Sequence, residues 1–277
     1  MNSLLQRAYL ASVVALALAA CDGSTAPTQS TPPATPNAVA TTGAPSDAPQ
    51  TTSLPSERLN HLVDDLLRAQ YPEGFDAEHQ CWKATYGDGE AAMAYCMRPL
   101  PPSAVLEEGR QIIYVATASA ADIEGNAAYR YGAVDPGMFD AFRLSVAPNG
   151  KATVTASRKG MDFGSAGDCG CVNADLVALG TNVHGWVFSS GGTAQGTTTA
   201  THSLVAPVGN TFMDVGGIPQ YVEDDQDVEY RIAIGSEKAE NGWYPVTVTK
   251  YRKNERLDSR VLRFDAGAKR YSMPESF

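Results

Sequence analysis

The strongest structural signal in the chain lies in residues 142–154, which read FRLSVAPNGKATV. Apolar side chains alternate at Phe142, Leu144 and Val146, which is the period of a strand with one buried face. Residues 148–150, Pro-Asn-Gly, then supply a turn, and β-branched residues follow it. This stretch therefore predicts an antiparallel hairpin and, with it, a β-rich fold.

Short β-prone runs separated by turn residues recur from about residue 110 onward. They lie at residues 112–115, 176–179, 186–188, 230–234, 246–249, 261–264 and around Tyr271. The Thr-rich stretch at 197–201 suits an exposed strand better than a linker, because threonine is β-branched. We therefore predict a mainly β domain of the β-rich α+β kind, an antiparallel sandwich or barrel.

One amphipathic helix is predicted at the start of this domain, over residues 56–70. Its apolar residues follow the helical spacing i, i+3, i+4, i+7, i+8: Leu59, Leu62, Val63, Leu66 and Leu67. Ser56 has a side chain suited to capping the first turn. Tyr71 is expected to end the helix, since a residue before a proline is biased away from the helical conformation.

The chain begins with a segment of a different kind. Residues 8–20 form a 13-residue apolar run behind Arg7. That length is too short for a membrane-spanning helix, which needs about 20 residues. The run ends in Leu-Ala-Ala-Cys at residues 18–21, which resembles the lipobox of bacterial lipoproteins. The resemblance implies a signal peptide over residues 1–20 and a mature N-terminus at Cys21, which carries a diacylglyceryl group and usually an N-acyl chain.

Residues 21–55 are predicted to be a disordered tether behind the lipid. Residues 22–55 contain eight Thr, seven Pro, six Ala and four Ser, and they lack the apolar surface that would offset the entropy of ordering. The resemblance places the protein in the bacterial cell envelope, lipid-anchored and facing the periplasm. In enteric bacteria, an aspartate directly after the lipidated cysteine tends to keep a lipoprotein in the inner membrane, and Asp22 has this position. The rule does not hold across all bacterial groups, so the choice between inner and outer membrane stays open.

The globular part, residues 56–277, is acidic. It carries 29 acidic and 20 basic residues, a net charge of −9. This charge argues against nucleic acid and against an anionic lipid surface, because both favour clustered Lys and Arg. It suits a protein partner that is basic.

Export makes disulfide bonds feasible. With the lipidated cysteine set aside, four cysteines remain: Cys81, Cys96, Cys169 and Cys171. A Gly-Asp-Gly turn lies between the first two, so we favour a bond between them, which stabilises by about 3 kcal/mol for a ~15-residue loop. The other pair, separated by one residue, leaves three alternatives: a cross-link to the first pair, a strained bridge between the two, or a redox dithiol.

Common catalytic signatures are absent from the sequence, which holds no G-x-S-x-G, H-E-x-x-H, S-x-x-K or phosphate-loop motif. We therefore assign no catalytic, cofactor-binding or metal-binding residue. His184 and His202 flank a Gly/Thr-rich hairpin, which suggests a weak zinc hypothesis. An acidic run at 223–227 is expected to form a solvated loop. Its aspartates are the candidates for contact with a partner or a cation: Asp224, Asp225 and Asp227.

Two classes of function fit these features. Residues 163–167, with Gly185-Trp186 and Gln195-Gly196, are similar to proteobacterial lipoproteins, a likeness that implies no activity. A small exported β protein with a lipid anchor and no catalytic motif also resembles the immunity or inhibitor lipoproteins that act against envelope-targeting toxins or hydrolases. We therefore expect a non-enzymatic protein-binding module. The alternatives are an envelope hydrolase that uses unmarked Asp, Glu or His residues, and an envelope assembly or solute-binding accessory.

Overall fold

The computed structural model describes residues 54–123, 127–194, 197–222, 225–236, 239–274 and 277. The expected signal peptide, Cys21 and all but the end of the expected tether lie outside this part of the chain. The fold prediction is confirmed: the described residues are mainly β, the sheets are antiparallel, and one α-helix precedes them.

Helix α1, Ser56–Gln70, lies where the apolar spacing predicts it. Leu62, Val63, Leu66 and Leu67 form its buried stripe. The expected cap was wrong, because Ser56 is the first helical residue, Pro55 occupies the N-cap position, and no side chain caps the helix there. At the other end the backbone N–H of Tyr71 donates to the Leu67 carbonyl at 2.9 Å.

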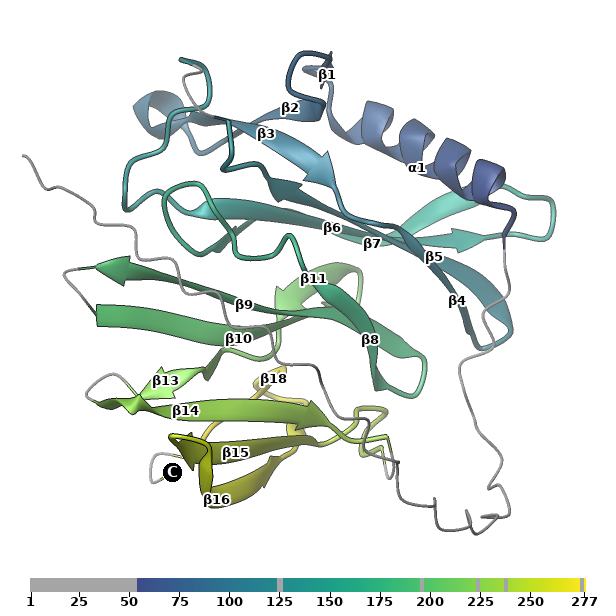
Figure 1. Cartoon of the computed structure of the whole chain (residues 1–277). Helices are drawn as coiled ribbons and strands as arrows, with labels where there is room; N and C mark the ends of the chain where they lie inside the picture. The colour runs from purple at the N-terminus through teal and green to yellow at the C-terminus, as the bar shows by residue number, and fades with distance from the viewer. Residues whose placement is uncertain (1–53, 124–126, 195–196, 223–224, 237–238, 275–276) are drawn as a thin grey trace, which may run out of the picture. The chain divides into compact units, whose positions relative to one another are not determined.

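Sheet 1 is the largest sheet, with seven antiparallel strands in the order β1-β2-β3-β5-β6-β7 and β4 paired to β5 (Figure 1). The strands are β1 Phe75–Asp76, β2 Cys81–Tyr86, β3 Met93–Pro99, β4 Ser103–Glu107, β5 Arg110–Ser119, β6 Gly137–Val146 and β7 Ala152–Phe163. The predicted hairpin is confirmed as β6–β7, which closes from Val146 opposite Ala152. Gly150 takes a left-handed φ of 81° in its turn.

Two further sheets follow in chain order. Sheet 2 has the order β11-β10-β9-β8 with β12 paired to β10, and sheet 3 has the order β13-β14-β15-β16. Their strands are β8 Asp175–Gly180, β9 Val183–Ala194, β10 Thr197–Val208, β11 Thr211–Asp214, β12 Ile218–Pro219, β13 Tyr221–Val222, β14 Asp225–Ile234, β15 Val246–Arg252 and β16 Glu255–Leu262. A short pair, β17 Phe264–Asp265 and β18 Arg270–Tyr271, completes the fold.

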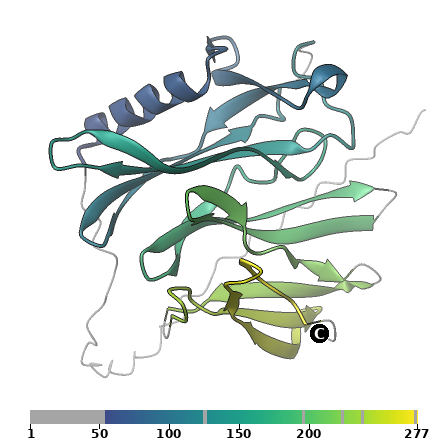
Figure 2. The same cartoon turned by 180° about the vertical axis from the view of Figure 1, so that it is seen from behind.

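The elements form layers in the order α1, sheet 1, sheet 2, sheet 3, as both views show (Figures 1 and 2). An apolar core fills each of the three spaces between layers. Leu66 and Phe142 belong to the core between α1 and sheet 1, Phe139 and Trp186 to the core between sheets 1 and 2, and Leu204 and Val248 to the core between sheets 2 and 3.

The expectation that strands begin near residue 110 was wrong, because β1 to β4 lie within residues 75–107. Strand β3 shows why: three consecutive residues, Tyr95, Cys96 and Met97, are buried. The Cys96 side of β3 contacts a small cluster around the disulfide, while the other side faces α1. A strand covered on both faces loses the alternation by which a half-exposed strand is recognised.

Candidate functional site

An apolar groove of about 610 Å³ runs beside helix α1, and we call it the α1 groove. Its apolar lining comes from the helix, the first two strands and the connection after β3: Val63, Leu67, Phe75, Trp82 and residues 99–102. Asp64 and Arg68 of the helix also line it, and they form an ion pair at 2.8 Å. The groove therefore has an apolar interior beside paired charges.

Local sequence explains the walls of the α1 groove. Residues 99–102, Pro-Leu-Pro-Pro, contain three prolines, which lack the N–H needed to continue a strand, and β3 accordingly ends at Pro99. Trp82 is buried and contacts the ring of Phe75 edge to face, with 5.3 Å between the ring centroids. Phe75 lines the groove and keeps 46% of its surface exposed, so its ring is open to a bound partner.

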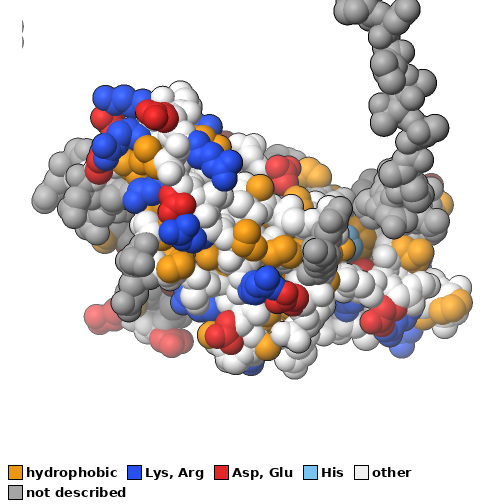
Figure 3. Space-filling view, turned by 90° about the horizontal axis from the view of Figure 1, so that it is seen from below, with side chains coloured by type: hydrophobic (Ala, Val, Ile, Leu, Met, Phe, Trp, Pro, Cys, Tyr) orange, Lys and Arg blue, Asp and Glu red, His pale blue; other side chains and the backbone are white. Residues whose placement is uncertain are grey.

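The part of the chain that carries the α1 groove also carries the acidic excess. Residues 56–222 hold 18 acidic and 10 basic residues, whereas residues 223–277 hold 11 acidic and 10 basic ones. Basic, acidic and apolar side chains are mixed over the face that Figure 3 shows, on the side of the molecule where sheet 3 lies. Attraction for a basic partner is therefore concentrated in the part formed by α1, sheet 1 and sheet 2.

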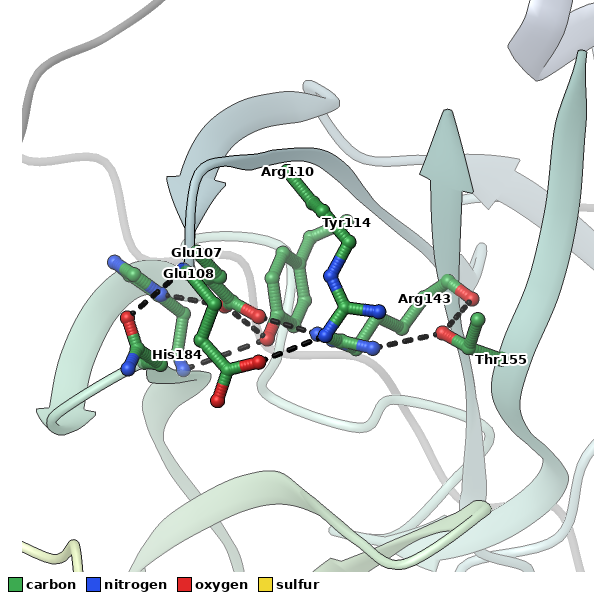
Figure 4. A network of polar contacts seen from close by, with 8 residues as sticks. Glu107, Glu108, Arg110, Tyr114, Arg143, Thr155 and His184 are labelled. Atoms are coloured by element: carbon green, nitrogen blue, oxygen red, sulfur yellow. Dashed lines mark hydrogen bonds and ion pairs between the residues drawn. The ribbon is translucent and has the colours of Figure 1, made fainter. Parts of the chain in front are cut away.

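A buried polar network joins sheets 1 and 2 around Glu107, whose side chain is 2% exposed (Figure 4). Glu107 accepts hydrogen bonds from Tyr114 at 2.8 Å and from Arg143 at 2.5 Å, and it pairs with His184 Nδ1 at 2.9 Å. Glu107, Tyr114 and Arg143 belong to β4, β5 and β6 of sheet 1, respectively. His184 belongs to β9 of sheet 2. The network is therefore a polar connection across the core between these sheets.

The electrostatics of this network favour an ionised Glu107. Burial alone would raise the pKa of Glu107, but hydrogen bonds from its three neighbours outweigh burial and hold that pKa below the ordinary value. Among the described residues, no buried side-chain nitrogen or oxygen lacks a hydrogen-bond partner. The network is saturated internally, so its geometry fits a structural role between sheets.

A second buried carboxylate, Asp140 on β6, lies on the opposite side of sheet 1. Asp140 accepts hydrogen bonds from the hydroxyls of Tyr71 and Tyr86, both at 2.5 Å, and from the backbone N–H of Gly160 at 2.7 Å. Burial raises the pKa of Asp140, and these hydrogen bonds offset only part of the rise. This site joins the end of α1 to the strands beneath it.

The structure does not bring His184 and His202 together. His202 lies opposite Ser189, five positions along β9 from His184. Its two ring nitrogens contact the Ser189 hydroxyl at 3.3 Å and the Tyr230 carbonyl at 2.8 Å, while His184 contacts Glu107. The zinc hypothesis is therefore withdrawn.

The candidate aspartates of the acidic run take different places. Asp224 lies outside the described residues, and strand β14 begins at Asp225, so from that residue onward the expected loop was wrong. Asp225 pairs with Arg252 at 2.5 Å and Asp227 with Lys253 at 2.9 Å. The two described aspartates are thus paired with basic residues of the neighbouring β15–β16 hairpin.

The four described cysteines form two disulfides. Cys81 bonds to Cys96, as the sequence favours, and Cys169 bonds to Cys171. All four residues are fully buried, the second pair within the core between sheets 1 and 2. Of the alternatives considered for Cys169 and Cys171, the structure therefore shows the direct bridge between these two residues.

The α1 groove was missed by sequence reasoning. Two features of the sequence could have pointed to it: the run Pro-Leu-Pro-Pro at residues 99–102, and Trp82, which follows a cysteine. Nothing local connects these two segments to Val63 and Leu67 of the helix, and only the fold brings them to one groove.

Among the described residues, no helix has the length and apolar character needed to cross a membrane. Within that same part of the chain, no group of three or more His, Cys, Asp or Glu side chains is placed to hold a metal ion. No known family model matches the chain, and comparison with curated proteins and with solved structures found no similar protein.

Proposed function

We propose that this protein is a lipid-anchored, non-enzymatic binding module of the bacterial cell envelope, which captures a basic protein through the α1 groove. The observation that carries the proposal is the groove itself, about 610 Å³ in volume and bordered by Phe75, which is 46% exposed. Concave apolar sites with an aromatic anchor are where binding energy concentrates in protein interfaces.

The partner expected for this groove has apolar side chains flanked by Lys or Arg. The apolar part would cover Val63, Leu67 and Phe75, while the flanking charges would meet the acidic residues of the helix and its surroundings. Opposite charge accelerates capture, and attachment to a membrane raises the effective concentration at that surface. An immunity or inhibitor role follows if the partner is a toxin or hydrolase that attacks the envelope.

Site-specific crosslinking in the cells that produce the protein tests this use of the groove. A photoreactive phenylalanine analogue placed at position 75 should give a discrete crosslinked protein. The same analogue at Val261, which is 58% exposed on β16, should not, because it lies far from the groove in the fold. Equal crosslinking from both positions, or none from position 75, would contradict the proposal.

The captured protein should then be purified and titrated against the full-length chain and its Phe75→Lys variant. We expect the variant to bind at least about tenfold more weakly, a loss of roughly 1.4 kcal/mol, because a like charge replaces an apolar contact. The matched Val261→Lys variant should bind as the parent chain does. If the partner is a lytic enzyme, the parent chain should inhibit it and the Phe75→Lys variant should not.

The anchoring part of the proposal has its own test. Cys21→Ser removes the sulfur that would carry the lipid, so the variant should move from the membrane fraction to the soluble fraction. Several acyl chains give stable anchoring, so the parent chain should remain with membranes at high salt. Membrane association that persists in Cys21→Ser would refute lipid anchoring without affecting the groove.

A further inference from the structure

A second, polar groove lies between the end of β7 and the strands of sheet 2. It consists of two adjoining cavities of about 320 and 370 Å³, which share Asp162, Phe163 and Asp214. The backbones of the two sheets meet beside it, where the Ser157 N–H donates to the Asn210 carbonyl at 3.2 Å. We call it the β7–β11 groove, and it shares no lining residue with the α1 groove.

The face of sheet 2 that lines this groove changes from apolar to hydroxyl-bearing along its strands. On β9 the buried Phe188 is followed on the same face by Ser190, and on β10 Val205 is followed by Ser203, Thr201 and Thr199. Ser190 pairs in register with Thr201, and its hydroxyl lies 3.2 Å from that of Ser203. Four hydroxyls, each able to donate and to accept, therefore converge on one cavity.

Two carboxylates occupy this groove in different environments. Asp214 is held in place, since its Oδ1 accepts the backbone N–H groups of Leu204 at 3.0 Å and Gly216 at 2.9 Å. Burial raises the pKa of Asp214 despite these bonds. Asp162, near the end of β7, is exposed. The sequence alone does not indicate which of its 29 acidic residues share a site. In the fold, Asp162 and Asp214 line the same cavity.

The remaining groups restrict the ligand further. Phe163 packs edge-on against Phe188, with 5.0 Å between ring centroids, and remains partly exposed at the groove. Arg158 also lines the groove, and its guanidinium donates to the Phe212 carbonyl at 3.3 Å. Two carboxylates against one arginine disfavour an anionic ligand. A metal ion is not favoured either, because no group of three or more His, Cys, Asp or Glu side chains among the described residues is placed to hold one.

We propose that the β7–β11 groove binds a neutral oligosaccharide. Sugar hydroxyls would donate to Asp162 and Asp214 and exchange hydrogen bonds with the Ser and Thr hydroxyls. The C–H face of a sugar ring would pack on Phe163. An apolar wall with a few convergent polar groups is the usual composition of a small-ligand site. This inference does not depend on the α1 groove or on the lipid anchor.

Calorimetric titration of the full-length chain in detergent tests the proposal. The probes are the tetramer of N-acetylglucosamine, cellotetraose, and a tetramer of galacturonic acid. The two neutral tetramers are tested as separate candidates, and saturable binding of either one, with none of the acidic tetramer, supports the site.

Matched variants locate the binding. Asp162→Asn and Thr201→Val should each weaken saccharide binding about tenfold, the effect of losing one or two hydrogen bonds. Thr198→Val serves as control, because Thr198 lies on the opposite face of the same strand and its hydroxyl contacts that of Thr193 at 2.9 Å. Three outcomes would overturn the proposal. They are a parent chain that binds neither neutral tetramer, a parent chain that binds Ca²⁺ and no saccharide, and groove variants that both bind the saccharide as tightly as the parent chain does.

Discussion

The two faces of sheet 1 each bury a carboxylate that accepts hydrogen bonds from tyrosine. Burial raises the pKa of both acids, yet the net pKa shifts have opposite signs. On the face toward sheet 2, Glu107 has its pKa lowered, and on the face toward α1, Asp140 has its pKa raised. The difference lies in the partners. Arg143 bonds directly to Glu107, whereas Asp140 is bonded to two phenols and one backbone N–H. The positive charge of Lys159 also lowers the pKa of Asp140, but it acts without a hydrogen bond and contributes least.

Neutral hydrogen-bond donors therefore lower the pKa of a buried acid less than a cation bonded directly to it does. Removing a carboxylate from water costs several kcal/mol, and a phenol or amide returns only part of that cost. An adjacent guanidinium adds direct charge attraction in a medium that screens weakly. Glu107 is thus an ionised connection between sheets, while the fold favours the protonated form of Asp140.

Glu107→Gln should have the largest effect. Because Arg143 and His184 would lose the carboxylate between them, we expect the free energy of unfolding to fall by about 3–5 kcal/mol. Urea unfolding of the full-length chain, followed by tryptophan fluorescence, measures this change. The neighbouring Glu108→Gln is the control, since Glu108 is 62% exposed in its pair with Arg110 and should cost no more than about 0.5 kcal/mol. Equal losses in both variants would remove the distinction between a buried and an exposed pair.

The pH dependence should separate the two acids next. The contribution of Glu107 is complete above its unfolded pKa of about 4.3 and is lost as pH falls through its lower folded value. The contribution of Asp140 is complete below its unfolded pKa of about 3.9 and is lost as pH rises through its higher folded value. Each slope is at most about 1.4 kcal/mol per pH unit.

Urea unfolding at a series of pH values tests these signs. The stability advantage of the parent chain over Asp140→Asn should shrink as pH rises, and its advantage over Glu107→Gln should grow. Slopes of the same sign for both variants would show that the cation beside Glu107 does not set the difference.

The smallest effect is expected from the tyrosines. Tyr114→Phe removes a hydrogen bond to an ionised carboxylate and should cost about 2 kcal/mol, whereas Tyr86→Phe removes one to Asp140 and should cost about 1 kcal/mol. Thermal unfolding of both variants gives the comparison. A greater loss in Tyr86→Phe would contradict this ranking of the two carboxylates.

Sequence patterns were sufficient where structure is local. The β6–β7 hairpin and helix α1 depend on spacing within a few residues, and both lie where the pattern places them. Ser56 failed as a cap because the helix begins one residue earlier than a capping serine requires. Strand β3 was missed because both of its faces are covered, which removes the alternation.

The polar sites lay beyond sequence reasoning for a different reason. Glu107 is followed by another glutamate and resembles any solvated pair, while Arg143 and His184 lie 36 and 77 positions away along the chain. Likewise Asp162 and Asp214 meet only because β7 lies beside β11 in the fold. A single sequence carries no signal for such distant pairs.

The layered arrangement also sets an order of assembly. Each sheet is built from one uninterrupted run of chain, 75–163, then 175–219, then 221–262. A chain exported behind a signal peptide, as proposed above, folds after it crosses the membrane and emerges N-terminus first, so each layer can pair its strands before the next one arrives. Most strands that pair within a sheet are also consecutive along the chain, which keeps contacts local and speeds folding. Until β8 to β11 arrive, however, the face of sheet 1 that holds Phe139 and Glu107 stays open to water, and such exposed apolar surface favours aggregation.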